Sequence, residues 1–164
     1  MKKARNAVSL LLLLITGLCY AQSPDLVVNQ SKLQGSIEIR KRKFQPSHCA
    51  IVEGCTVAGQ RKLLRFDTGT PNIGNQDIVL GDPRNNPLFE FSPCHGHYHL
   101  TSYAIYELLN SSGTVVITGR KQAFCLLDSS KYLATAGPSN GYTCGNQGLT
   151  AGWQDVYSRN LDCQ

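Results

Sequence analysis

The sequence lacks a long apolar segment, clear helix signals and any internal repeat. Its longest apolar run, Val8 to Leu18, is well short of the ~18 residues that a membrane span needs, so no span is expected. The chain after this run is rich in Gly, Ser, Thr, Asn and β-branched residues, which favour strands and turns over helices. We therefore expect one mainly β domain.

The first 21 residues resemble a secretory signal peptide. A basic start precedes the apolar run, and Cys19-Tyr20-Ala21 supplies a small residue for cleavage. Cleavage after Ala21 would leave a single domain, residues 22–164, in a secreted or periplasmic protein. A lipoprotein cut before Cys19 is the alternative, although Leu18 stands where a small residue is expected. Without its leader the chain has 13 basic and 11 acidic residues, too small an excess to indicate nucleic acid.

Cysteines indicate an oxidising compartment. Six remain after the predicted cleavage, and an even number in an exported chain favours disulfides. They are Cys49, Cys55, Cys94, Cys125, Cys144 and Cys163. Six cysteines allow 15 pairings; Cys49 with Cys55 closes the smallest loop and so loses the least chain entropy. Free thiols at one pair remain the alternative.

Short strands with turn residues between them are expected along the chain. The hairpin prediction joins 102–109 to 114–118 around the turn Asn110-Ser111-Ser112-Gly113. Further strands are predicted at 25–28, 35–43, 62–66, 77–80 and 122–127. Residues 89–100 are expected to be extended, and 129–152 to be a loop.

Three of the four histidines lie within one five-residue segment. His95, His97 and His99 alternate with other residues, so an extended segment would place all three imidazoles on one face. Neutral imidazoles bind copper, zinc and nickel, and the pattern alone does not choose among them. Surface histidines on a strand are the alternative. His48, the fourth histidine, is expected to be structural or exposed.

The segment Cys94-His95-Gly96-His97-Tyr98-His99 resembles the copper motif of the lysyl oxidase family. Other blocks follow in the family order: Gly119 to Leu126 resembles the segment with the cofactor lysine, and Asp155-Val156-Tyr157 with Asp162-Cys163-Gln164 resembles the segment with the cofactor tyrosine. The resemblance extends from Pro24 to Gln164. It implies an antiparallel β-sandwich-like catalytic domain with long loops and disulfides.

The resemblance implies a copper-dependent amine oxidase of the protein-lysine 6-oxidase type. His95, His97 and His99 would bind Cu²⁺, and Lys121 and Tyr157 would form lysine tyrosylquinone. The enzyme would use dioxygen to convert primary amines, including peptidyl lysine, into aldehydes, with release of hydrogen peroxide and ammonia. Asp155 is a candidate for the catalytic base; a loop-capping aspartate is the alternative.

The chain also departs from the family pattern. Family domains continue for several strands past the position of Gln164, so we expect a fold that is incomplete at its C-terminus. The family implies the pairs Cys94–Cys144 and Cys49–Cys55. Family partners of the other two cysteines would fall near Lys131 and Trp153, neither of which is cysteine, so we predict a Cys125–Cys163 pair.

Two other functions compete with the oxidase. A non-enzymatic extracellular copper-binding domain would use the histidines but leave Lys121 and Tyr157 unmodified. A zinc-dependent hydrolase would need a catalytic carboxylate near the metal, and the sequence has no HExxH or comparable pattern.

Overall fold

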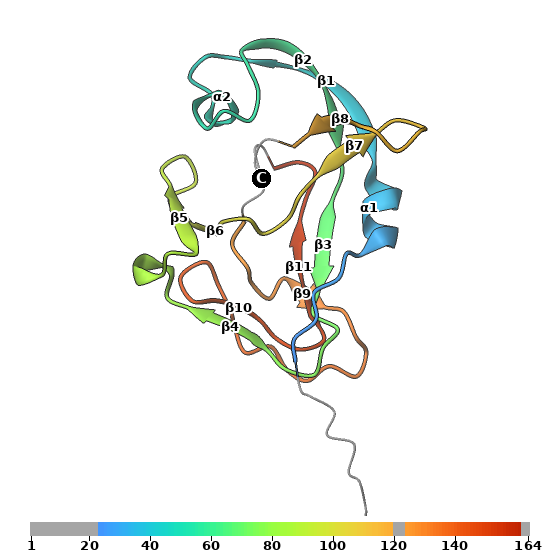
Figure 1. Ribbon diagram of the computed structural model, residues 1–164. Helices are drawn as coiled ribbons and strands as arrows, with labels where there is room; N and C mark the ends of the chain where they lie inside the picture. Colours follow the sequence, from blue (N-terminus) through green and yellow to red (C-terminus); the bar gives the residue numbers. More distant parts are fainter. Residues whose placement is uncertain (1–22, 120–123, 162–164) are drawn as a thin grey trace, which may run out of the picture.

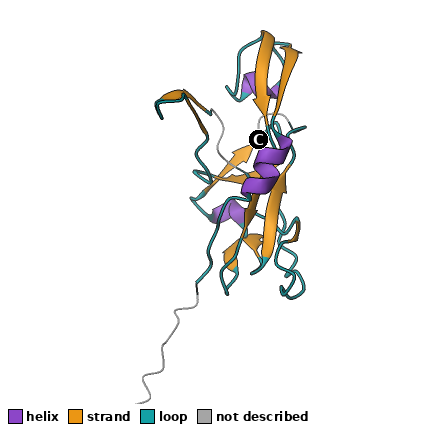
Figure 2. Cartoon of the chain, turned by 90° about the vertical axis from the view of Figure 1, so that its right-hand side faces the viewer, coloured by secondary structure: helices purple, strands orange, loops and turns teal. Residues whose placement is uncertain are grey.

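The computed structural model describes residues 23–119 and 124–161, and this part of the chain is mainly β, as predicted (Figures 1 and 2). The strands pair in small antiparallel sheets. In chain order the elements are α1 (Gln30–Ser36), β1 (Glu38–Phe44), α2 (Cys49–Val52), β2 (Gly59–Arg65), β3 (Thr68–Pro71), β4 (Ile78–Gly81), η1 (Pro83–Asn85), β5 (Phe89–Ser92), β6 (His97–Leu100), β7 (Glu107–Leu109), β8 (Val115–Thr118), β9 (Ser130–Lys131), β10 (Gln147–Leu149) and β11 (Trp153–Tyr157).

The strand β11 lies at the centre of the body, between β3 and β9 (Figure 1). It pairs with β3 from Gln154 to Tyr157 and with β9 at Trp153 and Gln154. Trp153 lies directly opposite Lys131, the two positions at which the family resemblance would have placed cysteines. Both edges of β11 are paired at Gln154, and Asp155 to Tyr157 continue the pairing with β3.

The core is small, and polar side chains complete it. Phe124, Leu126 and Leu149 are buried, and so are Asn72 and Gln147. Gln147 accepts a hydrogen bond from the backbone N–H of Leu126 at 2.9 Å and donates one to the carbonyl of Tyr98 at 2.7 Å. Buried polar side chains whose hydrogen bonds are all formed help to determine which segments pack together. Here Gln147 joins β6 to the segment that begins at Phe124.

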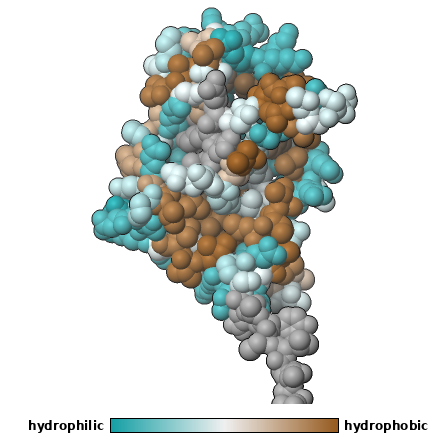
Figure 3. All heavy atoms as spheres, viewed as in Figure 1, coloured by the Kyte–Doolittle hydropathy of each residue, from teal (hydrophilic) through white to brown (hydrophobic). Residues whose placement is uncertain are grey.

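Two hairpins extend from this body, and both expose apolar side chains. The β1–β2 hairpin includes exposed Ile39, and the β7–β8 hairpin exposes every residue of β8. Apolar side chains gather over β7–β8 at the upper right of Figure 3. Strands β7 and β8 pair antiparallel, so the predicted hairpin over 102–118 is confirmed, although its first strand begins only at Glu107.

Several predicted elements differ from the structure. Residues 30–36 form a helix that the sequence did not suggest, with the Asn29 side chain accepting a hydrogen bond from the Lys32 N–H at 3.1 Å as its N-cap. The predicted strand at 25–28 is reduced to one bridge, between Leu26 and Asn72. The predicted strand at 122–127 begins outside the described residues, and its described part makes one bridge at Phe124. The loop expected at 129–152 contains β9 and β10.

The disulfide pairings also differ from the prediction. Cys49 pairs with Cys94, and Cys125 with Cys144. The pairs Cys49–Cys55, Cys94–Cys144 and Cys125–Cys163 are therefore wrong. The smallest loop does not form, because the fold places Cys94, 45 residues away in sequence, against Cys49 at the start of α2. Cys55 is also disulfide-bonded, and Cys163 lies outside the described residues.

The disulfides agree with the compartment inferred from the cysteine count, since such bonds persist in oxidising environments. The predicted signal peptide lies outside the described residues. Within the part of the chain that the structure describes, no helix is both long and apolar enough to cross a membrane.

Candidate metal centre and cofactor site

The three clustered histidines converge at the β5–β6 hairpin. His97 and His99 lie on β6, whereas His95 lies in the turn before it and not on an extended strand as predicted. Gly96 has a φ of +70°, which a glycine adopts without strain. This turn brings His95 back over the strand, and its ring centroid lies 5.2 Å from that of His99.

The donor atoms of the cluster are close enough to share one ion. One ring nitrogen from each of the three histidines lies within 4.8 Å of the others. A metal held at about 2.0–2.1 Å by three nitrogens needs those nitrogens roughly 3–4 Å apart, so small side-chain rotations suffice. His99 is only 3% exposed. Three convergent imidazoles fit copper or zinc, and they leave coordination positions open for other ligands.

Sulfur ligands are excluded from this cluster. Cys125 and Cys144 also lie within 4.8 Å of a ring nitrogen of His97. Because the two cysteines are joined in a disulfide, neither offers a thiolate. The imidazole cluster is therefore the group in the described chain whose donor set fits a divalent transition metal.

Tyr157 lies at the end of β11, packed among other aromatic rings. Its ring centroid is 4.6 Å from that of Phe124, and its hydroxyl donates a hydrogen bond to the carbonyl of Cys125. Burial raises the pKa of Tyr157, and the nearby Asp155 carboxylate raises it further. The phenol is therefore held in its protonated form at neutral pH.

Asp155 is two residues before Tyr157, so both side chains point to the same face of β11. It is 1% exposed. Its Oδ1 accepts a hydrogen bond from the Ser129 hydroxyl at 3.1 Å, and its buried Oδ2 has no hydrogen-bond partner. Burial raises the pKa of Asp155 to about 8, which is close to what a general base needs near neutral pH.

Phe124 and Cys125 connect the two halves of the site. On one side, the backbone N–H of Leu100 donates to the carbonyl of Phe124 at 2.7 Å, one residue after His99. On the other side, the Phe124 ring and the Cys125 carbonyl contact Tyr157. The histidines and the tyrosine, far apart in sequence, therefore lie on either side of one short segment.

Comparison of the sequence with known proteins identifies the family of this chain. The family model for lysyl oxidase matches residues 24–164. The chain belongs to the lysyl oxidase family. It is 34% identical over 160 residues to lysyl oxidase homolog 3B of Danio rerio, covering 90% of this chain and 19% of that protein. It is also 34% identical over 159 residues to lysyl oxidase homolog 2 of Homo sapiens, covering 89% and 20%. The chain thus spans about a fifth of the length of these relatives.

Lys121, the family's expected cofactor lysine, lies outside the described residues, but both flanks of its segment are fixed. The backbone N–H of Gly119 donates to the carbonyl of Tyr106 at 2.7 Å. A Cβ at Gly119 would lie 3.2 Å from the Cβ of Tyr106, so the close approach favours glycine. Phe124 forms the other flank, through its bridge to Leu100.

A cavity of about 210 Å³ opens beside the family tyrosine. Its described walls include Tyr157, Tyr106, Phe66, Phe44 and Leu63, with Arg65 among the polar groups. A mostly apolar cavity with a few polar groups is a common form of binding site for small molecules.

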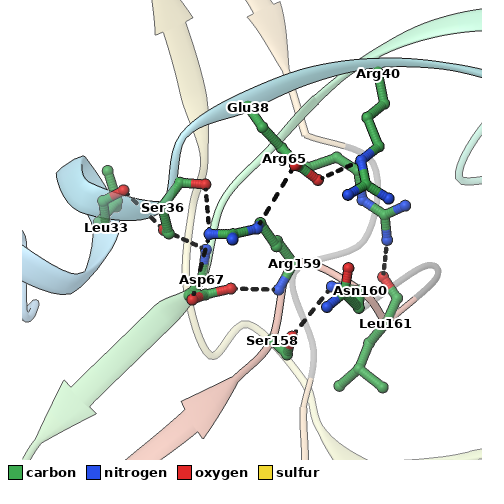
Figure 4. A network of polar contacts seen from close by, with 10 residues as sticks. All are labelled: Leu33, Ser36, Glu38, Arg40, Arg65, Asp67, Ser158, Arg159, Asn160 and Leu161. Atoms are coloured by element: carbon green, nitrogen blue, oxygen red, sulfur yellow. Dashed lines mark hydrogen bonds and ion pairs between the residues drawn. The ribbon is translucent and has the colours of Figure 1, made fainter.

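Arg159 fixes the chain immediately after Tyr157 (Figure 4). Its backbone N–H donates to Asp67 Oδ1 at 2.7 Å, and its Nη1 donates to the carbonyl of Ser36 at 2.9 Å. Its Nε lies 3.8 Å from Glu38 Oε2. These contacts attach the end of β11 to α1 and β1, so the position of Tyr157 depends on residues throughout the chain.

The sequence did not identify some residues that position this site. Gln147 and Arg159 act through contacts with distant segments, and no local pattern marks them. Tyr103 and Tyr106 stand out as aromatics, but only the fold places Tyr103 at 5.5 Å and Tyr106 at 6.3 Å from Phe124. His48 caps α2, with its Nδ1 accepting from the Ala50 N–H, in agreement with the structural role expected.

Proposed function

We propose that this chain is a copper-dependent amine oxidase of the lysyl oxidase type, with His95, His97 and His99 as copper ligands. Its substrates would be primary amines, as peptidyl lysine or as small amines. The observation that carries the proposal is the placement of three convergent imidazoles and Tyr157 on either side of Phe124–Cys125. Family membership supports the same function.

The second cofactor would be lysine tyrosylquinone formed from Lys121 and Tyr157. Lys121 is three residues before Phe124, and three residues span at most ~11 Å, to which the lysine side chain adds its own length. Phe124 itself packs on Tyr157. Covalent geometry therefore allows the amine to reach the phenol ring. Together, copper and the quinone would supply oxidation of the amine by dioxygen and water to an aldehyde, ammonia and hydrogen peroxide.

The chain's own residues would prepare the substrate for this chemistry. The cavity beside Tyr157 would take the alkyl chain of the amine and exclude water from it. Asp155 would accept the proton from the carbon that bears the amine. Its pKa of about 8 means that it holds and releases a proton near neutral pH, and the Ser129 hydroxyl fixes one of its oxygens.

We also propose that the protein is exported, through cleavage of residues 1–21, to the cell exterior or the periplasm. The disulfides Cys49–Cys94 and Cys125–Cys144 support export. In that compartment the proposed reaction would use dioxygen and the lysine side chains of other proteins.

The test loads the full chain with Cu²⁺ in air and measures intact mass, quinone absorbance and amine-dependent hydrogen peroxide. We expect a cross-linked mass, a quinone spectrum and peroxide. Tyr157→Phe and Lys121→Arg should still bind copper but produce none of the three signals. Copper binding with unmodified Lys121 and Tyr157 would contradict the oxidase and favour the non-enzymatic copper-binding domain. Absence of metal binding would contradict both functions.

A further inference from the structure

Glu53 is distant from the histidine motif in sequence but adjacent to it in space. It follows α2 as the C-cap residue, with its backbone N–H donating to the carbonyl of Cys49 at 2.8 Å. The disulfide between Cys49 and Cys94 attaches this helix to the turn that carries His95, with 5.7 Å between the two Cα atoms. A covalent bond therefore holds Glu53 beside the cluster.

Both carboxylate oxygens of Glu53 contact the β5–β6 hairpin. Oε2 lies 3.3 Å from Nε2 of His95, and Oε1 accepts a hydrogen bond from the hydroxyl of Ser92. The side chains of Glu53 and His95 are 14% and 13% exposed. Because water is largely excluded, the contact between them is much less screened than a surface ion pair.

Such a contact has a specific effect on a metal-binding histidine. A carboxylate at one ring nitrogen fixes the tautomer, prevents the ring from rotating away and makes the imidazole a stronger donor. Of the three histidines, His95 needs this most, because it lies in a turn whereas His97 and His99 are fixed by the pairing of β5 with β6. The negative charge also favours a divalent cation nearby.

We propose that Glu53 is a positioning residue of the metal centre, which orients His95 for metal binding through its carboxylate and is itself oriented by Ser92. This inference rests on the proposed function, since it assumes that the three histidines bind a metal. It adds to the histidine triad a carboxylate from another part of the chain, one that the motif does not contain.

The test measures metal affinity, using Zn²⁺ and Cu²⁺ separately in competition with a chelator of known affinity. The Tyr157→Phe background prevents any reaction of the tyrosine during the Cu²⁺ titration. We expect Glu53→Ala to weaken binding of both ions by about 10–100-fold, the usual effect of removing such a partner. Glu53→Gln keeps an acceptor oxygen and should lose less, and Ser92→Ala less again. Glu107→Ala, at an exposed position on β7, is the matched control and should bind as the parent protein does.

Thermal unfolding of the metal-free variants and Cu²⁺ electron paramagnetic resonance separate positioning from a purely structural role. A structural link would lower the Tm of Glu53→Ala without changing the affinity of the folded protein or its spectrum, and that result would overturn the inference. Should Glu53→Ala fail to fold, affinities of Glu53→Gln and Ser92→Ala equal to that of the control would overturn it as well. Absence of metal binding by the parent protein would instead remove the proposed function first.

Discussion

The site has two halves, a metal half with the three clustered histidines and a tyrosine half with Tyr157 and Asp155. The chain assembles these two halves differently. The three histidines come from one hairpin segment, in which pairing of β5 with β6 and one glycine turn bring them together, and Glu53 contacts His95 from outside this segment. Tyr157 and Asp155 depend on β3, β9, residues 124–125 and the contacts of Arg159. The grouping of the histidines is thus encoded mainly by local sequence, whereas the tyrosine half requires the completed fold. The two halves should therefore respond differently to substitution.

The largest expected effect separates metal binding from quinone formation. His99→Ala removes a buried histidine of the cluster and should abolish stoichiometric copper binding and, with it, the quinone. Tyr157→Phe keeps the ring that packs on Phe124 and should bind copper within about 3-fold of the parent protein, because its hydroxyl contacts a backbone carbonyl and not a histidine. Copper stoichiometry and visible absorbance measure both. A Tyr157→Phe protein without copper would show that the halves are not separable.

The next largest effect is that ionisation of Asp155 should make the free energy of unfolding depend on pH. Its pKa is raised by burial to about 8 in the folded chain, against about 3.9 when unfolded. Between these values the folded state binds more protons, so stability is highest at the acid end and falls as pH rises, by up to about 1.4 kcal/mol per pH unit. Asp155→Asn should remove this contribution. Chemical denaturation at pH 5, 6, 7 and 8 would measure it in the metal-free protein.

Asp82 provides the control for that experiment. It is exposed, and its hydrogen bonds with Arg84 lower its pKa to about 2. Asp82→Asn should therefore leave the stability profile between pH 5 and 8 as in the parent chain. Equal slopes in the parent and Asp155→Asn proteins would mean that the Asp155 carboxyl ionises normally, and would weaken its assignment as the base.

Loss of a disulfide should have an effect comparable with the full change in stability that Asp155 causes between pH 5 and 8, and one disulfide also bears on metal binding. Cys49–Cys94 is separated by 45 residues and Cys125–Cys144 by 19. The chain-entropy model predicts losses of about 4 and 3 kcal/mol when each pair is replaced by alanine. Urea unfolding of each double variant measures the loss. The Cys49–Cys94 variant should also bind metal more weakly, because Glu53 is then no longer held at His95; unchanged affinity would contradict this link.

The same contrast explains what the sequence could predict. The grouping of the histidines follows from their spacing and is confirmed, although His95 comes from a turn. The hairpin of β7 and β8 follows from a clear turn between two apolar segments. In contrast, α1 has a polar sequence and forms through its Asn29 cap and its packing near β3.

The features that were not predicted depend on distant contacts. Disulfide connectivity joins segments that are distant in sequence, and neither cysteine spacing nor family resemblance predicts it correctly. The sequence marks Asp155 only as a candidate base or loop cap; its burial is a feature of the folded chain, in which it lies on β11 opposite Thr70 of β3. The contact of Glu53 with His95 likewise needs the Cys49–Cys94 bond. These three features share a long-range origin, so a local pattern could not reveal them.

The smallest expected effect lies in the β1–β2 hairpin, outside both halves of the site. Lys41 lies directly opposite Lys62, and both are exposed. Like charges at directly opposed positions destabilise a strand pair by a few tenths of a kcal/mol. Lys41→Glu should therefore stabilise the protein by about 0.5 kcal/mol at low salt, and the gain should disappear in 1 M salt, where charges are screened within ~3 Å.

Lys43 is the matched control for this pair, because it lies opposite the neutral Gln60 on the same face of the hairpin. Lys43→Glu makes the same change of charge without relieving a direct repulsion, so its gain should be smaller. Urea unfolding at two salt concentrations compares the two variants. Equal gains would mean that overall charge, and not the Lys41–Lys62 pair, is responsible. Neither variant should alter metal affinity or quinone formation, since the hairpin's lysines contribute to neither the histidine cluster nor the tyrosine strand.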